Sequence, residues 1–341
     1  AQAESVQVVA SAADLVKTPP PVRFARFRFP QFRFNSSASC RLQRIGTTEM
    51  PVSEVEENGQ KKLIIEKDGA KAEVFLFGAT VTKFETASGH SLIWCSKTAK
   101  LDGTKAIRGG IPLVFPQFGQ PIKEMAQHGF ARNNVWSCAS KTDDSVTLTL
   151  DNTKVTHDAW PFAYKLTFKV SVEPEKLATS YYVQNTGSDS FPFHCLQHTY
   201  LNVGDITGTK VIGLKSNRFL DKTSSDVTSL NFETSESVEI SAFTDRVYVG
   251  LGGEVKVVCP SKTIVVEGRA SYWSTLEASE SVPMASDTVV WNPWEANARG
   301  MADFDDEGYK EMLCIEPGLV SAFHKLEPGK VMELTQVLGV I

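Results

Sequence analysis

Four short segments of the chain place ionisable side chains among residues that are normally buried. They are residues 108–116, 127–133, 194–200 and 314–318. Histidine and glutamate commonly transfer protons near neutral pH, and the planar fork of arginine suits an anion. A charged group in such surroundings needs a partner, a ligand or a shifted pKa. These four segments therefore contain the candidate functional residues.

Glu316 is the clearest of these candidates. It follows four apolar residues, 312–315, and precedes Pro317 and Gly318. This order predicts a carboxylate at the end of a strand, against a turn and facing a cleft. Taken alone, the local pattern favours a structural role for Glu316 in an internal salt bridge, for example to an arginine.

Several common catalytic motifs are absent from the sequence. There is no phosphate-binding Gly-x-x-x-x-Gly-Lys-Ser/Thr loop and no Gly-x-Ser-x-Gly elbow, and residues 250–253 form only an incomplete dinucleotide fingerprint. His194 and His198 are four residues apart, but their surroundings favour an extended chain that separates them by about 13 Å. One zinc ion cannot bind two ligands so far apart. We therefore predict no metal, nucleotide or redox cofactor.

The elements that must position these residues are predicted to be strands. Apolar and polar residues alternate over residues 145–150 and 164–172, as in a strand with one buried face. Shorter strand-like runs lie at residues 63–66, 73–77, 80–85, 91–94, 177–184, 255–258, 263–267, 311–315 and 331–338. Only residues 296–312 are compatible with a short helix. The pattern predicts an all-β fold, a large antiparallel sandwich or barrel formed by residues 49–341 as one domain.

Residues 1–48 differ from the rest of the chain in composition. They hold seven Lys and Arg against Glu4 and Asp14, a net charge of +5, whereas the remaining 28 basic and 38 acidic residues give −10. An N-terminal segment rich in arginine and serine and poor in acids is typical of an organelle transit peptide. We expect this segment to be disordered and to direct the protein to the chloroplast, with mitochondrion and cytoplasm as alternatives. An ordinary disordered tail, or a basic arm that touches an anionic surface, would have the same composition.

The composition also limits the partners. The net charge of −5 gives no basic footprint for nucleic acid, and no apolar run of about 18 residues is long enough to span a membrane. Six cysteines lie far apart without a Cys-x-x-Cys pair, which suits a reducing compartment. We expect a monomer that binds a small molecule.

Taken together, the polar segments resemble the aldose 1-epimerase (mutarotase) superfamily, and within it the glucose-6-phosphate 1-epimerases. The matching pieces occur in the family's order at residues 108–116, 127–133, 198–200, 244–246, 290–294, 300–304 and 314–318. The resemblance extends from about residue 56 to the C-terminus. It implies a galactose mutarotase-like β-supersandwich.

The resemblance also implies roles for individual residues. The family's catalytic histidine and glutamate fall on His198 and Glu316. Its substrate-binding positions fall on Arg108, Gln127, His128, Arg132 and Asp245. His194 is expected to be structural, and Trp291 and Trp294 to belong to the core or to the wall of the cleft. The acidic residues at 303 and 305–307 are expected to be solvated on a loop.

The implied reaction interconverts the α- and β-anomers of a hexose 6-phosphate, which we expect to be D-glucose 6-phosphate. Ring opening needs a base at the C1 hydroxyl and an acid at the ring oxygen. We assign Glu316 as base and His198 as acid, on opposite sides of the sugar, and Arg108 and Arg132 as a clamp for the phosphate. The arginines could instead pair with Asp245 or Glu316. A sugar- or sugar phosphate-binding β-sandwich without turnover is the alternative function.

Overall fold

The computed structural model describes residues 52–153, 156, 158 and 160–341. The basic segment predicted at residues 1–48, with its targeting role, lies outside the described residues. Within the described part, no helix is long and apolar enough to cross a membrane.

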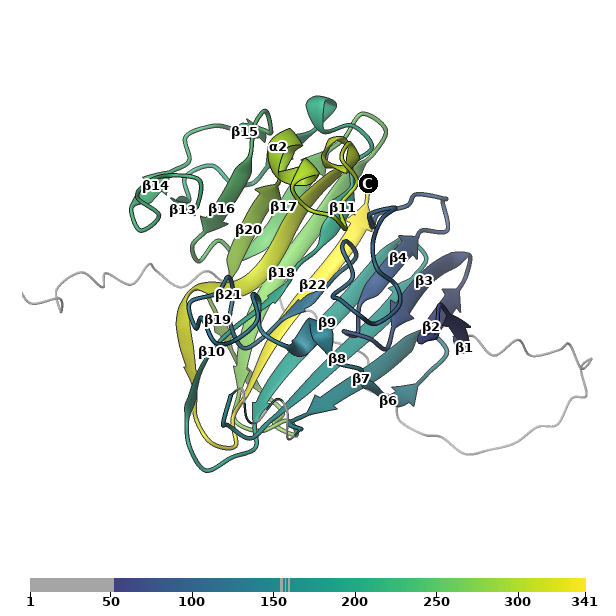
Figure 1. The fold of residues 1–341 in the computed structure, drawn as a ribbon, viewed down its shortest axis with the longest axis vertical. Helices are drawn as coiled ribbons and strands as arrows, with labels where there is room; N and C mark the ends of the chain where they lie inside the picture. The colour runs from purple at the N-terminus through teal and green to yellow at the C-terminus, as the bar shows by residue number, and fades with distance from the viewer. Residues whose placement is uncertain (1–51, 154–155, 157, 159) are drawn as a thin grey trace, which may run out of the picture. The chain divides into compact units, whose positions relative to one another are not determined.

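The described residues form 22 strands in three antiparallel sheets (Figure 1). The N-terminal sheet has the order β1 (Val52–Glu57), β2 (Gln60–Lys67), β3 (Ala70–Phe75) and β4 (Val81–Glu85). The eight-stranded sheet has the order β14 (Leu230–Phe232), β13 (Arg218–Asp221), β16 (Thr244–Tyr248), β20 (Asp287–Asn292), β21 (Met312–Leu326), β10 (Phe191–Gln197) and β5 (Leu113–Val114), with β11 (Tyr200–Asn202) also paired to β21. The ten-stranded sheet has the order β15 (Ser237–Glu239), β12 (Lys210–Ile212), β17 (Gly253–Val258), β18 (Thr263–Trp273), β22 (Val331–Val340), β9 (Lys176–Asn185), β8 (Tyr164–Glu173), β7 (Ser145–Asp151) and β6 (Ser137–Lys141), with β19 (Ser281–Met284) paired to β18.

The predicted all-β antiparallel architecture is confirmed. The predicted runs coincide with strands except residues 91–94, which make only isolated bridges, such as that of Ile93 to Leu201. The short helix α2 (Trp294–Arg299) begins two residues before the stretch predicted for it, 296–312, and ends within it at Arg299. A 3₁₀ turn, η3 (Gly308–Lys310), lies later in the same stretch. Two other 3₁₀ turns are η1 (Ala131–Asn133) and η2 (Ile206–Gly208).

Strand β21 gives the eight-stranded sheet two different faces. Leu313, Ile315 and Leu319 belong to the main hydrophobic core, whereas Cys314 and Val320 belong to separate clusters. Successive side chains of a strand point to opposite faces, so the even-numbered residues, Glu316 among them, face away from the main core. We call this the outer face of the eight-stranded sheet.

The two large sheets approach each other closely where β18 packs against β21. A side-chain Cβ added at Gly268 of β18 would lie 2.7 Å from the Cβ of Pro317. The proline therefore lies inside β21 and packs against the facing sheet. The prediction that Glu316 ends a strand against a turn is wrong, because β21 continues through Pro317 to Leu326.

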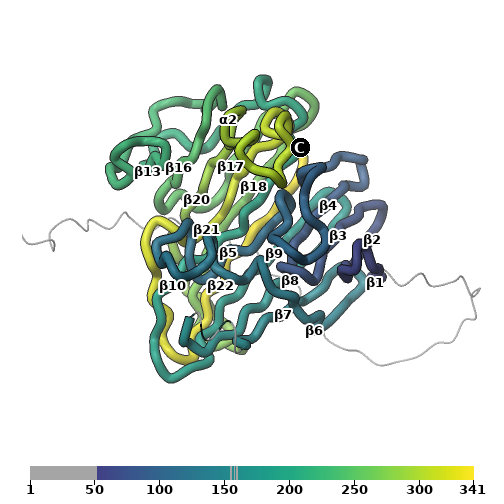
Figure 2. The backbone as a smooth tube through the Cα atoms, in the orientation of Figure 1, coloured from purple at the N-terminus to yellow at the C-terminus, as the bar shows by residue number. Residues whose placement is uncertain are grey.

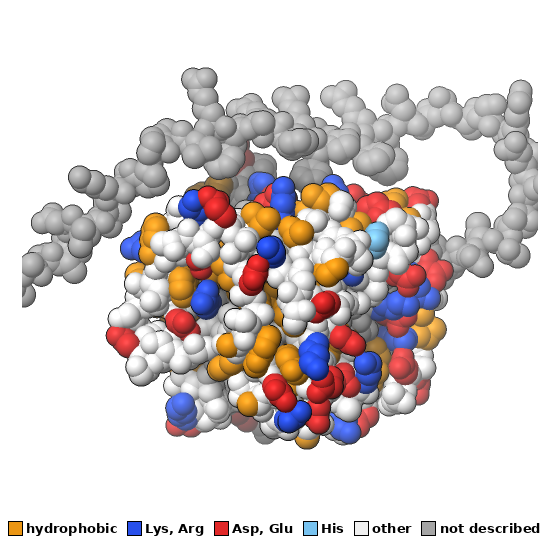
Figure 3. Space-filling model, turned by 90° about the horizontal axis from the view of Figure 1, so that it is seen from above, with side chains coloured by type: hydrophobic (Ala, Val, Ile, Leu, Met, Phe, Trp, Pro, Cys, Tyr) orange, Lys and Arg blue, Asp and Glu red, His pale blue; other side chains and the backbone are white. Residues whose placement is uncertain are grey.

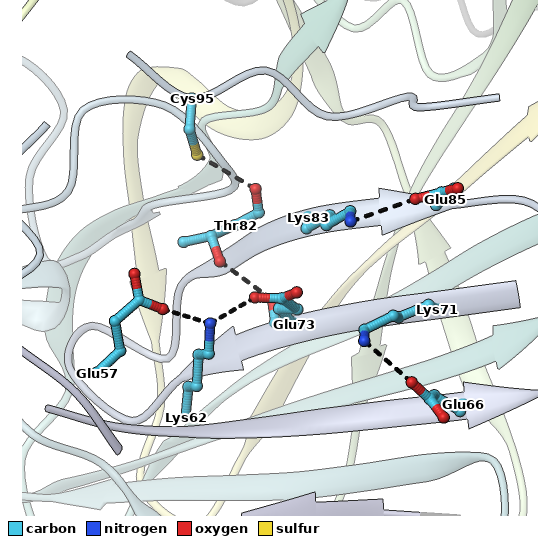
Figure 4. Close-up of polar contacts among 9 residues, drawn as sticks. All are labelled: Glu57, Lys62, Glu66, Lys71, Glu73, Thr82, Lys83, Glu85 and Cys95. Atoms are coloured by element: carbon cyan, nitrogen blue, oxygen red, sulfur yellow. Dashed lines mark hydrogen bonds and ion pairs between the residues drawn. The ribbon is translucent and has the colours of Figure 1, made fainter. Parts of the chain in front are cut away.

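The N-terminal sheet packs on β8 through β2 and β3. Figure 4 shows the polar contacts of its strands, in which the ammonium group of Lys62 contacts the carboxylates of both Glu57 and Glu73. The Cys95 thiol donates a hydrogen bond to the carbonyl oxygen of Thr82 at 3.2 Å. Because these charges satisfy one another, the cluster is structural. On the face of the described residues seen in Figure 3, basic and acidic side chains are likewise interspersed.

Candidate functional site

The outer face of the eight-stranded sheet brings His198 and Glu316 into contact. The Nδ1 atom of His198 lies 3.3 Å from Oε1 of Glu316, and their side chains are 8% and 1% exposed. His198 directly follows β10, and its backbone N–H donates to the carbonyl oxygen of Pro112 at 2.9 Å. The two side chains were predicted to flank the sugar from opposite sides. At this separation no sugar fits between them, so a substrate must approach both from the same side.

A buried polar network lies behind His198, between the two large sheets. The Thr179 hydroxyl donates to Oε1 of Gln197 at 2.6 Å, and the Gln197 amide donates to the carbonyl oxygen of Leu334 at 3.0 Å. The Thr199 hydroxyl donates to Oε1 of Gln336 at 2.7 Å. These bonds fix the residues on both sides of His198 to the ten-stranded sheet. Thr179 and Gln336 give no signal of this network in the sequence, because polar residues in strands are usually assigned to a wet face.

Aromatic rings surround the imidazole of His198. It stacks on Tyr200 with ring centroids 4.7 Å apart and planes 8° apart, and it meets the edges of Trp291 and His128 at 5.8 and 5.7 Å. Trp291 therefore contributes to the wall of the site. Trp294 packs on Tyr309 instead, at 5.3 Å.

The segment at residues 108–116 passes beside β10 and is joined to the segment at residues 127–133, in the blue part of the tube in Figure 2. They are anchored by an aromatic cluster in which Phe115 meets the edges of Phe130 and Trp160 at 5.8 and 5.1 Å. A bridge between Phe115 and Gly129 joins the two segments. Gly129 has φ of 73°, and a Cβ there would lie 2.0 Å from the Phe115 carbonyl oxygen, so the close approach requires glycine.

Arg108 extends towards this site, and an acidic partner balances much of its positive charge. Its guanidinium contacts Oδ1 of Asp303 at 3.3 Å through Nε and also through NH2, and NH1 donates to the Tyr200 hydroxyl at 3.4 Å. Asp303 is 3% exposed and also contacts Lys105 at 2.9 Å. The expectation that Asp303 is solvated is therefore wrong. Arg108 pairs with Asp303 and not with Asp245 or Glu316.

Arg132 is less well satisfied than Arg108. Its NH2 group donates to the carbonyl oxygen of Gln127 at 3.0 Å, and its Nε atom is buried with no partner among the described residues. Burial lowers the pKa of Arg132 to about 10, so it keeps its charge at neutral pH. Gln127 is exposed and contributes through its backbone. A half-buried guanidinium whose Nε–H is buried and unused is suited to hold an anion.

His128 is held in place by its backbone and by one ring nitrogen. It adopts a left-handed conformation with φ of 64°, and its Nδ1 accepts a hydrogen bond from the N–H of Gly119 at 3.1 Å. Burial and the nearby positive charge of Arg132 lower its pKa well below the ordinary value. His128 is therefore neutral at physiological pH.

Asp245 reaches the same face from β16. Pairing places Asp245 opposite Trp291, and Trp291 opposite Cys314, so all three point to the outer face. Burial raises the pKa of Asp245 to about 6. The structure thus brings Asp245 to the side of the sheet that carries His198 and Glu316.

Burial controls the ionisation of the central pair. Burial and the negative charge of Asp245 raise the pKa of Glu316 well above its ordinary value. Burial and the positive charges of Arg132 and Arg108 lower the pKa of His198 well below its ordinary value. These directions are opposite to those expected from mutual attraction alone, so without further charge in the site both groups favour their neutral forms.

His194 takes a different position from His198. Its Nδ1 accepts a hydrogen bond from the N–H of Phe118 at 3.1 Å, and its ring stacks on Phe323 with centroids 4.0 Å apart. It lies within strand β10, so the chain between the two histidines is extended, as predicted.

Comparison with known proteins identifies the family. Residues 61–339 match the model of the protein family described as aldose 1-epimerase.

The chain belongs to this family.

Proteins and structures similar to this aldose 1-epimerase family member extend over most of its length. A Cenchrus ciliaris protein named "Putative glucose-6-phosphate 1-epimerase" is 32% identical over 290 residues, which cover 80% of this chain and 82% of that protein. An Escherichia coli (strain K12) protein of the same name is 28% identical, with 82% and 90% covered. The crystal structure of a Salmonella typhimurium "putative mutarotase (YeaD)" has a TM-score of 0.71 and 25% identity, with 86% and 96% covered. The predicted family and its mutarotase-like fold are therefore confirmed, and the protein is an isomerase of the family that interconverts sugar anomers.

Replacing Asp245 with asparagine should change how the stability of this epimerase family member depends on pH. Because the carboxyl pKa is about 6 when folded and lower when unfolded, the folded state loses stability as pH rises from about 4 through 6. We expect Asp245→Asn to be more stable than wild type at pH 7.5, by up to about 3 kcal/mol, and similar at pH 4. Urea denaturation followed by tryptophan fluorescence measures both values.

The matched control is Asp143→Asn, which changes an exposed carboxyl group outside the site. It should leave the pH dependence as in wild type. If Asp245→Asn were less stable than wild type at pH 7.5, Asp245 would be a stabilising ion-pair partner and the prediction would fail.

Proposed function

We propose that this protein interconverts the α- and β-anomers of D-glucose 6-phosphate by acid–base catalysed ring opening and closure. The observation that carries the proposal is the contact of His198 with Glu316 at 3.3 Å, beside the half-buried Arg132, whose Nε has no partner among the described residues. The first two groups supply proton transfer, and the third supplies an anion site.

A contacting pair can serve both reacting oxygens from one side of the sugar. The C1 hydroxyl and the ring oxygen are bonded to the same carbon, so an acid and a base in contact can reach both. Glu316 takes the hydroxyl proton, His198 protonates the ring oxygen, and the roles reverse on closure after rotation about C1–C2. Oε2 of Glu316 is buried and has no hydrogen-bond partner among the described residues, so its capacity to accept a proton is not used within the protein.

The phosphate group of the substrate supplies a negative charge that favours the protonated form of His198. Without substrate, the positive charges of Arg132 and Arg108 help to keep His198 neutral. A phosphate dianion bound by these arginines opposes their field, so the His198 pKa rises when substrate binds. The substrate thereby favours the protonated form of His198, which acts as the acid.

Both arginines of the site and the names of two relatives support a phosphorylated sugar over a free one. Arg132 keeps an unsatisfied Nε, Arg108 lies close enough to add to the same positive field, and hydroxyl groups alone do not require two arginines. The relatives from Cenchrus ciliaris and Escherichia coli carry glucose 6-phosphate in their names.

Exchange between the anomers of glucose 6-phosphate, measured by saturation-transfer NMR, tests the proposal. We expect the protein to accelerate exchange, and His198→Asn to reduce the acceleration by at least about 10²-fold. His194→Asn is the matched control, because His194 is four residues earlier and packs on Phe323, and it should retain exchange. Binding of glucose 6-phosphate without accelerated exchange would contradict the proposal and favour a sugar phosphate-binding protein.

A further inference from the structure

The outer face carries a third donor atom next to the catalytic candidates. The Sγ atom of Cys314 lies 3.8 Å from Nδ1 of His198, the same nitrogen that contacts Glu316. One donor atom each from His198, Cys314 and Glu316 lies within 4.8 Å of the others, and all three residues are buried. The proposed anomer exchange does not use the thiol.

The spacing of these atoms matches the ligand shell of zinc. In tetrahedral sites Zn–S is about 2.3 Å and Zn–N and Zn–O about 2.0–2.2 Å, which separates neighbouring ligand atoms by roughly 3.3–3.7 Å. The observed separations of 3.3 Å for nitrogen to oxygen and 3.8 Å for sulfur to nitrogen fall close to this range. Imidazole, thiolate and carboxylate are also the three side-chain ligand types of zinc.

The backbone holds the three groups in this arrangement. Cys314 and Glu316 are two residues apart on β21, so both point to the outer face. Tyr200 of β11 pairs with Cys314, and the network around Gln197 and Thr199 fixes the chain that carries His198. The ligands are therefore gathered before any ion binds, which reduces the cost of binding.

The charges around the site act in both directions. Arg132 and Arg108 oppose a cation, whereas Asp245 favours one, and His128 is neutral. Binding of Zn²⁺ replaces the thiol proton of Cys314 and any proton on Glu316, and these protons pass to solvent. Two anionic ligands then balance the charge of the ion.

We propose that His198, Cys314 and Glu316 form a binding site for a thiophilic divalent cation such as Zn²⁺. The ion occupies the acid–base pair and excludes the sugar, so it is an inhibitor and not a cofactor. The exclusion of glucose 6-phosphate rests on the proposed function, whereas the binding of the ion does not.

Titration of the full chain with Cd²⁺ tests the site directly, because a cadmium–thiolate bond absorbs in the ultraviolet. We expect one equivalent of Cd²⁺ to produce this absorption and Zn²⁺ to displace it. Cys314→Ser should abolish the absorption and weaken Zn²⁺ binding by more than about 10-fold, since even ligand-supporting residues contribute 10–100-fold. Cys138→Ser is the matched control: Cys138 is a half-exposed free cysteine of β6, outside the site, and should bind as wild type does.

Two further measurements test the site without relying on the folding of Cys314→Ser or on catalytic turnover. Glu316→Gln should also weaken Zn²⁺ binding, and wild-type binding should strengthen with rising pH because protons are released. Absorption that persists in Cys314→Ser and disappears in Cys138→Ser would overturn the proposal, as would the absence of any cadmium–thiolate band in wild type. A protein that binds Cd²⁺ through Cys314 but exchanges no anomers would refute the proposed function and leave the metal site standing. A protein that exchanges anomers but shows no cadmium–thiolate band would support the proposed function and refute the metal site.

Discussion

Replacing Glu316 with glutamine is expected to slow anomer exchange of glucose 6-phosphate by at least about 10²-fold, without loss of stability. Glutamine preserves the shape of the side chain but cannot accept the proton of the C1 hydroxyl. Burial raises the pKa of Glu316, so ionisation of this carboxyl group costs the folded state stability as pH rises. The variant should therefore be at least as stable as wild type at neutral pH. Saturation-transfer NMR measures exchange, and urea denaturation measures stability.

The matched control for this substitution is Glu333→Gln. Glu333 is also buried, but it lies on β22 and accepts a hydrogen bond from the Trp273 indole at 2.9 Å. Its replacement should leave exchange near the wild-type rate and lower stability, because the indole loses a charged acceptor. Wild-type exchange by Glu316→Gln would show that Glu316 is not the base. A large loss of stability in the same variant would indicate a structural role.

The strands that sequence predicts well are those with one wet face. Residues 145–150 and 164–172 alternate strictly, and both lie in strands β7 and β8. Strand β21 is different, because its residues from Met312 to Val320 are buried on both faces. The alternation of apolar and polar residues that would reveal the length of this strand is therefore missing, and Pro317 was interpreted as part of a turn. Only the facing Gly268 shows why a proline fits within this strand.

The site depends on contacts that no local pattern contains. His198 and Glu316 were paired through the ordered resemblance to a family, since a single carboxylate near a proline favours a salt bridge. Asp303 was missed because it lies in an acidic stretch that is typical of a solvated loop. Its burial is compensated by ion pairs with Arg108 and Lys105, which are distant in the sequence.

The ionisation states of the acid and the base depend on burial, which only the structure shows. Sequence alone suggests attraction between an imidazolium and a carboxylate, whereas burial favours the neutral forms of both groups. The positive charges of Arg132 and Arg108 connect the ionisation of His198 to the choice of substrate. Under the proposed function, a sugar without phosphate would leave the positive field at His198 unchanged, so phosphate would contribute to chemistry as well as to binding. This link makes Arg132 the most informative arginine to replace.

Replacing Arg132 with alanine should reduce kcat/KM for glucose 6-phosphate by at least about 10²-fold, and that for free glucose much less. Hydrogen bonds to charged groups contribute about 1.5–3 kcal/mol each, and loss of a bidentate contact removes two of them. Arg132 has spare donors for such a contact, because its Nε has no partner among the described residues. Exchange kinetics of both sugars by NMR give the ratio.

Two further variants of the same type separate charge from geometry. Arg132→Lys keeps a positive charge but loses the planar fork, so it should recover only part of the preference for the phosphorylated sugar. Arg269→Ala removes an exposed arginine of β18, which pairs with Glu267 outside the site, and should leave both substrates unaffected. If Arg132→Ala lost exchange of glucose and glucose 6-phosphate equally, Arg132 would maintain the site as a whole, and the phosphate contact would have to be sought elsewhere.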